Sequence, residues 1–101
     1  MVPMPLTSAQ IRYLRGVAHP LKPLIQIGGR GVTPAFLAEL GVALDRHELV
    51  KVRLAGADRD ERQQQVEQLL QASGAELVQR VGHVASLYRR NEETPRLALP
   101  R

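Results

Sequence analysis

Cysteine and tryptophan are absent from the 101-residue chain, which has one Phe and two Tyr. The lack of cysteine excludes disulfides and thiolate chemistry and is compatible with the cytoplasm, where we expect the protein. No charged segment followed by an apolar stretch opens the chain, and no apolar run approaches the length of a membrane span. We therefore expect neither secretion nor contact with a membrane.

The small number of aromatic side chains limits how the protein could hold a nucleic acid. RRM and OB-fold domains stack bases on several exposed aromatic rings, and this chain cannot build such a surface. Any nucleic acid must then be held mainly through its phosphates and its shape, for which structured RNA is a natural target. Tyr13 and Tyr88 remain open as either base-stacking or partly buried side chains.

Acidic residues are also missing from the first 38 positions. This segment has four basic residues, whereas ten basic and ten acidic residues balance each other from Glu39 onward, so the whole net charge of +4 lies at the start. Such a charge suggests a polyanionic partner. Twelve of the 14 basic residues are Arg, whose forked guanidinium suits phosphate, although the base composition of the genome would equally explain it. The four early basic residues are Arg12, Arg15, Lys22 and Arg30.

Three helices and four strands are predicted from caps and periodicity. A capping box at Thr7 and Gln10 opens a helix over residues 8–18, and caps at Thr33 and Asp58 open helices over 34–46 and from 59 to the stop at Gly74. Strands are expected over residues 24–27, 49–54, 76–81 and 84–89, the last two as a hairpin. The order α-β-α-β-α-β-β predicts an α/β sandwich with a four-stranded mixed sheet. One domain covers residues 1–90, with its core from about residue 6, and the tail 91–101 is either disordered or paired along a sheet edge.

The segment that organises this fold is Gly28-Gly29-Arg30-Gly31, between the first strand and the second helix. Glycines allow positive φ and close approach to a ligand, and the helix start behind them offers free N–H groups. We predict that this GxxG loop, with Arg30, holds a phosphate backbone. Neither the Walker A spacing nor a dinucleotide fingerprint is present, and a bare GxxG is as consistent with a tight structural turn.

Residues for catalysis are not grouped in the sequence. His19, His47 and His83 are scattered, without zinc spacing or cysteine partners. We therefore expect a protein that is not an enzyme, with no metal, cofactor or small-molecule substrate. One alternative is a small nucleotide- or phosphate-binding enzyme that uses the same loop and helix N-terminus, and another is an adaptor that binds only proteins.

Basic residues also follow helical and strand spacing near the loop. Arg12, Arg15 and His19 lie at i, i+3 and i+7 on one stripe of the first helix. Lys51 and Arg53 share the solvent-facing side of the second strand. Each set is either an ordinary solvated face or part of a binding surface. If the first helix packs beside the loop, its arginines would join the loop in one continuous patch.

Four blocks of sequence, in order and correctly separated, resemble one known family. They are Leu6-Thr7, residues 18–23 (AHPLKP), residues 27–33 (IGGRGVT) and residues 48–52 (ELVKV). Together they resemble the CRM domain (chloroplast RNA splicing and ribosome maturation) in its stand-alone bacterial YhbY form. The similarity runs from about Leu6 to Arg90 and continues into residues 97–100.

The resemblance implies an RNA-binding domain with a fold like the C-terminal domain of translation initiation factor three. It also implies association with precursors of the large ribosomal subunit and a role in their assembly, and we expect a monomer. The family's GxxG falls on Gly28–Gly31. Gly29 occupies a position of this loop where the family commonly has a residue with a side chain. Its basic surface maps onto Arg12, Arg15, Lys22, Lys51 and Arg53, and the family has no established catalytic site.

Overall fold

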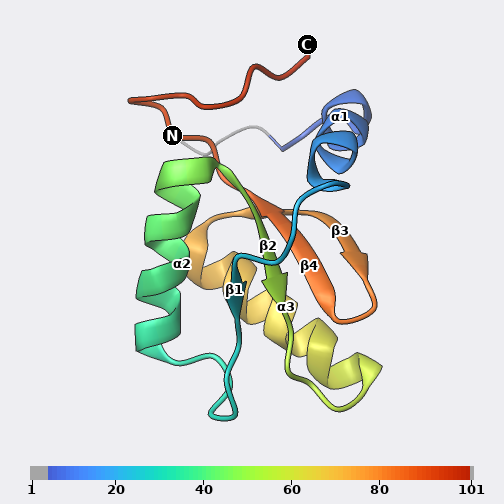
Figure 1. Cartoon of the computed structure of the whole chain (residues 1–101), viewed down its shortest axis with the longest axis vertical. Coiled ribbons are helices and arrows are strands. Elements are labelled where there is room, and N and C mark those ends of the chain that lie inside the picture. Colours follow the sequence, from blue (N-terminus) through green and yellow to red (C-terminus); the bar gives the residue numbers. More distant parts are fainter. Residues whose placement is uncertain (1–4, 101) are drawn as a thin grey trace.

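Three helices and four strands follow one another in the predicted order in the computed structural model, which describes residues 5–100 (Figure 1). The start of the predicted domain and Arg101 lie outside the described residues. The elements are α1 (Ser8–Ala18), β1 (Ile25–Gln26), α2 (Pro34–His47), β2 (Leu49–Arg53), α3 (Arg59–Ser73), β3 (Glu76–Val81) and β4 (Val84–Tyr88).

The helix ends lie where the capping residues predict them. The Thr7 side chain accepts a hydrogen bond from the Gln10 amide at 3.1 Å, and the Gln10 side chain accepts one from the Thr7 amide at 3.0 Å. The side chains of Thr33 and Asp58 likewise accept the amides of Phe36 and Glu61 at the starts of α2 and α3, without the reciprocal bond, and Gly74 ends α3 with a φ of 73°. These local bonds satisfy amides that a helix start leaves without partners.

The four strands form one mixed sheet in the order β1-β2-β4-β3. β1 is parallel to β2, and the other two pairs are antiparallel. The sequence analysis predicted a longer first strand that included Leu24, and this was wrong: β1 has two residues, and Leu24 is 53% exposed. The side chains of Ile25 and Ile27 point into the core, and because side chains alternate along extended backbone, those of Leu24 and Gln26 point to solvent.

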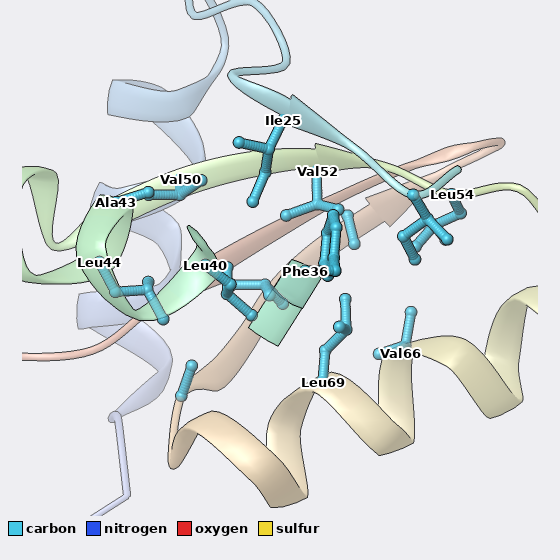
Figure 2. Close-up of a cluster of buried hydrophobic side chains, with 14 residues drawn as sticks. Ile25, Phe36, Leu40, Ala43, Leu44, Val50, Val52, Leu54, Val66 and Leu69 are labelled. Carbon is cyan, nitrogen blue, oxygen red and sulfur yellow. The ribbon is translucent and has the colours of Figure 1, made fainter. Parts of the chain in front are cut away.

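The main hydrophobic core lies between one face of the sheet and the helices α2 and α3 (Figure 2). Alternate residues of β2 point into it, as the sequence predicted, and Phe36 and Leu40 of α2 meet Val66 and Leu69 of α3 there. The β2 residues in this cluster are Val50 and Val52, with Leu54 just beyond the strand.

Helix α1 covers the opposite face of the sheet, where a second cluster forms. Leu14 and Ala18 are fully buried against Leu49, Val78 and Tyr88. The partly buried residues packed against this cluster come from α1 and from both ends of the chain, and they are Leu6, Val17, Leu97 and Leu99. The second cluster therefore joins α1, the sheet and the C-terminal tail.

A buried carboxylate holds the tail in place. Glu48, between α2 and β2, is inaccessible to solvent and has a φ of 61°, unusual for a residue other than glycine. Its Oε2 accepts the amide of Asn91 at 2.7 Å, and its Oε1 accepts the amides of Arg96 and Leu97. Residues 91–97 therefore wrap around a negative charge that the backbone amides neutralise in part.

A second charged side chain joins α2 and α3. Arg89 donates to the Ser73 carbonyl of α3 at 2.8 Å and to the Gly41 carbonyl of α2 at 3.1 Å. It also pairs with Asp45 at 2.8 Å. Because the Ser73 carbonyl is at the end of α3 and lacks an intrahelical partner, the guanidinium satisfies a group that would otherwise need water.

Replacing Glu48 by Gln would test the buried carboxylate. The Gln side chain has one acceptor oxygen, so at least one of the three tail amides loses its partner, which costs about 1–3 kcal/mol. We expect the free energy of unfolding in urea to fall by this amount. The exposed Glu67→Gln is the matched control, with an expected change within about 0.5 kcal/mol. Equal stability of the two variants would contradict this role of Glu48.

Candidate nucleic-acid interface

The glycine loop is a tight turn at the end of β1. The Gly31 amide donates to the Gly28 carbonyl at 3.0 Å, and the two glycines form an isolated antiparallel bridge. Gly31 has a φ of 77°, in the left-handed region that side chains disfavour. The turn therefore requires glycine at its fourth position. Gly28 and Gly29 have ordinary φ values and open space where a Cβ would lie.

A shallow hollow of about 310 Å³ lies between this loop and the first turns of α2. Arg30 is exposed on its rim, and in the described part of the chain the amides of Gly29 and Arg30 have no hydrogen-bond partner. Glu39 of α2 also lines the hollow, so one acid offsets the one arginine there. The hollow can accept a phosphate group at its rim, but its net charge is close to zero.

Lys51 connects the loop end of the sheet to the segment after α1. Its Nζ donates to the Leu21 carbonyl at 3.0 Å, and its carbonyl accepts the Leu24 amide at 2.9 Å. Lys22, exposed, lies between these two contacts in the chain. The structure therefore brings the two predicted lysine positions together along the β1 side of the sheet.

A backbone hydrogen bond to Arg53 connects the end of β2 to the start of the glycine loop. The Arg53 carbonyl accepts the Ile27 amide at 3.0 Å, one residue before Gly28, and the Arg53 side chain is exposed. Alternation along β2 places Lys51 and Arg53 on the face that also holds Leu49, which is the face α1 covers. Lys22, Lys51, Arg53 and Arg30 follow one another from α1 to the loop, and we call these four residues the basic line.

The arginines of α1 lie outside this line. Arg12, Arg15 and His19 are all exposed, on the side of α1 turned away from Leu14 and Ala18. The sequence analysis considered that α1 packs beside the loop, and it does not: α1 and the loop are at opposite ends of the longest axis (Figure 1).

The apolar stripe of α1 explains this separation. It packs on Leu49 at the start of β2 and on Tyr88, its partner across the sheet. The loop follows β1, which runs parallel to β2, and therefore lies beyond the other end of β2.

One further basic residue, Arg62, has a structural contact. It is half-buried and donates to the Gly56 carbonyl at 3.3 Å. Gly56 packs so closely on it that a Cβ there would lie 2.7 Å from the Arg62 amide nitrogen. Arg62 is thus a structural residue of the turn before α3.

The two tyrosines have different surroundings. Tyr88 is buried, and burial, followed by the nearby carboxylate of Glu48, raises the pKa of its phenol. It cannot stack on a base, whereas Tyr13 is 41% exposed on α1. Tyr13 is therefore the one exposed aromatic ring among residues 5–100, since Phe36 belongs to the core.

The structure also offers no cluster for a metal ion: within residues 5–100, no three His, Asp or Glu side chains lie close enough together to hold one. No helix in the same range is both long and apolar enough to cross a membrane.

The side chains that the sequence analysis missed are Glu48, Arg89 and two arginines of the tail region, Arg90 and Arg96. A charged residue directly before a buried strand was the available signal for Glu48.

A family model for the CRS1/YhbY (CRM) domain matches residues 6–89. The chain belongs to the CRS1/YhbY (CRM) domain family. The match covers all three helices and all four strands, and it confirms the resemblance carried by the four sequence blocks.

Bacterial members of this CRM family match over almost their whole length. An "RNA-binding protein" of Haemophilus influenzae is 43% identical over 96 residues, covering 95% of this chain and 96% of that protein. A "probable RNA-binding protein" of Pseudomonas aeruginosa is 42% identical, covering 87% of this chain and 85% of the relative. YqeI of Bacillus subtilis, also named a probable RNA-binding protein, is 34% identical, with coverages of 94% and 99%.

A solved structure confirms the fold. The solution structure of a hypothetical protein from Staphylococcus aureus, described as a candidate RNA-binding protein, superposes with a TM-score of 0.81. The two chains are 35% identical, and the match covers 94% of this chain and 99% of that one. The predicted α/β domain with a four-stranded mixed sheet is therefore correct.

The turn geometry of the loop leads to a stability test. Gly31→Ala places a Cβ in the left-handed region, which costs about 1–2 kcal/mol. Gly29→Ala meets open space and a permitted φ, so we expect unchanged or slightly higher stability. Urea unfolding of both variants measures the difference. If Gly31→Ala unfolds at the same urea concentration as Gly29→Ala, the turn does not depend on a positive φ.

Proposed function

We propose that this protein binds structured ribosomal RNA through the phosphate backbone and assists assembly of the large ribosomal subunit. The observation that carries the proposal is a set of exposed cationic side chains from α1 to the glycine loop, outside any ion pair. Among residues 5–100 the one ion pair joins Arg89 and Asp45, so these cations are available to a ligand. The exposed members are Arg12, Arg15, Lys22, Arg30 and Arg53.

Contact with phosphates, rather than with bases, follows from the surface. Tyr13 is a single exposed ring and cannot form a stacking platform of the kind that single-stranded RNA requires. Guanidinium groups and the free loop amides are donors that suit phosphate oxygens. A folded RNA presents phosphates at fixed spacing, which suits cations held on a rigid sheet and helix.

The ribosomal part of the proposal rests on family membership. The relatives in Haemophilus influenzae and Bacillus subtilis are named as RNA-binding proteins and match this chain nearly end to end. The resemblance to the stand-alone bacterial form of the CRM domain points to precursors of the large subunit as the RNA.

A phosphate-binding enzyme is the less favoured alternative. The hollow beside the loop has Glu39 in its wall, and the loop lacks the lysine by which a Walker A motif holds phosphates. An acid facing the ligand repels a small polyanion such as ATP, whereas a long RNA can contact Arg30 on the rim without entering the hollow. Titration with ATP beside RNA distinguishes the two functions.

Salt dependence tests the phosphate contacts. Each contact contributes about 0.7–0.9 to the slope of log affinity against log salt, so five cations give a slope of about −4. A labelled mixed-sequence RNA hairpin, titrated by fluorescence anisotropy at several salt concentrations, measures this slope. A flat response, or ATP binding tighter than RNA binding, would contradict the proposed function.

Paired substitutions test the arginines of α1. Arg12→Gln with Arg15→Gln should lower the magnitude of the salt slope by about 1.5 and leave the fold intact, because both side chains are exposed. Arg46→Gln with Arg59→Gln is the control, since it removes the same charge from exposed positions outside the proposed surface. Equal losses of affinity in the two double variants would show that net charge, not position, determines binding.

A further inference from the structure

A second hollow, larger than the one beside the glycine loop, lies at the opposite end of the described molecule. It has a volume of about 540 Å³ and runs between α1 and the C-terminal tail. We call it the tail groove, and its lining residues are Gln10, Arg90 and residues 95–100. The proposed function does not use this groove.

The tail groove is more cationic than the hollow beside the loop. Arg90 and Arg96 both line it and are exposed, and no acidic residue among those described lines it. The hollow beside the loop combines Arg30 with Glu39. Two acids of the tail, Glu92 and Glu93, are exposed but do not line the groove. Two guanidinium groups without an opposing acid favour an anionic ligand.

Hydrogen bonds and apolar contacts hold the walls of the groove. The Arg96 amide donates to the buried carboxylate of Glu48, so the backbone that carries one guanidinium is anchored in the core. On the other wall, the Gln10 side chain donates to the Pro100 carbonyl at 2.9 Å. Leu97 and Leu99 pack against the second cluster, beneath α1. A groove built in this way exists before a ligand arrives, which lowers the ordering cost of binding.

We propose that the tail groove binds RNA phosphates and forms a second contact for the same RNA that lies along the basic line. The inference rests on the proposed function and extends it to the far end of the molecule. The groove shares Gln10 with α1, the helix that also has the exposed Arg12 and Arg15. Because the longest dimension of the described chain is 38 Å, an RNA that touches both ends must be an extended or double-stranded segment rather than a nucleotide.

Removal of both guanidinium groups tests the groove. We expect Arg90→Gln with Arg96→Gln to weaken binding of the mixed-sequence hairpin about tenfold and to lower the magnitude of the salt slope by about 1.5. The substitutions keep the Arg96 amide on Glu48, so urea unfolding should match the wild type. Arg46→Gln with Arg59→Gln is again the charge-matched control, with little expected change in affinity.

Three outcomes would overturn the inference. The first is unchanged affinity of the Arg90/Arg96 variant while the wild-type protein binds RNA with a steep salt slope; the proposed function then stands without the groove. The second is an equal loss in the control variant. The third is a competition result: polyglutamate displaces the RNA from the wild-type protein but not from the Arg90/Arg96 variant. The groove would then bind an acidic protein segment in preference to RNA. Absence of RNA binding by the wild type would instead remove the proposed function itself.

Discussion

A carboxylate with no access to water is the constraint on which the rest of this structure depends. An isolated buried charge is costly, and three backbone amides from the tail offset that cost at Glu48. The same residue ends α2, through its amide on the Leu44 carbonyl, and begins β2. Its φ of 61° makes the sharp change of direction between these two elements. Glu48 thereby connects three parts of the fold: its backbone joins α2 to β2, and its side chain binds the tail.

Local signals in the sequence were sufficient to predict most of the helices and strands. Side-chain oxygens at Thr7, Thr33 and Asp58 act within three residues, so helix starts are readable without knowledge of the fold. Alternation in β2 likewise identified the core face of the sheet. Long-range placement was not readable: an apolar stripe on α1 shows that the helix is buried on one side, but not which end of the sheet receives it. The structural roles of Arg62 and Glu48 were not predictable for the same reason, because their hydrogen-bond partners are distant in sequence or lie in irregular backbone.

The separation of α1 from the loop changes what the candidate interface can hold. The predicted residues are spread between α1 and the glycine loop, which lie at opposite ends of the molecule, and Lys51 of β2 contacts the segment between α1 and β1. A small ligand could touch only one end of such a surface. A polymer with regularly spaced charges can use all of it, and each contact need only be weak because the contacts add. The shallow shape of the hollow at Arg30, the loop end of the basic line, is therefore consistent with the proposed ligand.

The two ends of this surface are stabilised by different means. At the tail end, the Arg89 amide donates to the Glu48 carbonyl at 2.9 Å, and the Arg89 guanidinium donates to carbonyls of both α2 and α3. At the loop end, a single turn hydrogen bond and the positive φ of Gly31 determine the backbone path. Buried charge networks fix geometry firmly because each member left unpaired would be costly. An RNA that contacts both ends would therefore meet a preorganised surface at α1 and the tail, while the glycine loop, with fewer constraints, can adjust its amides to the phosphates that reach it.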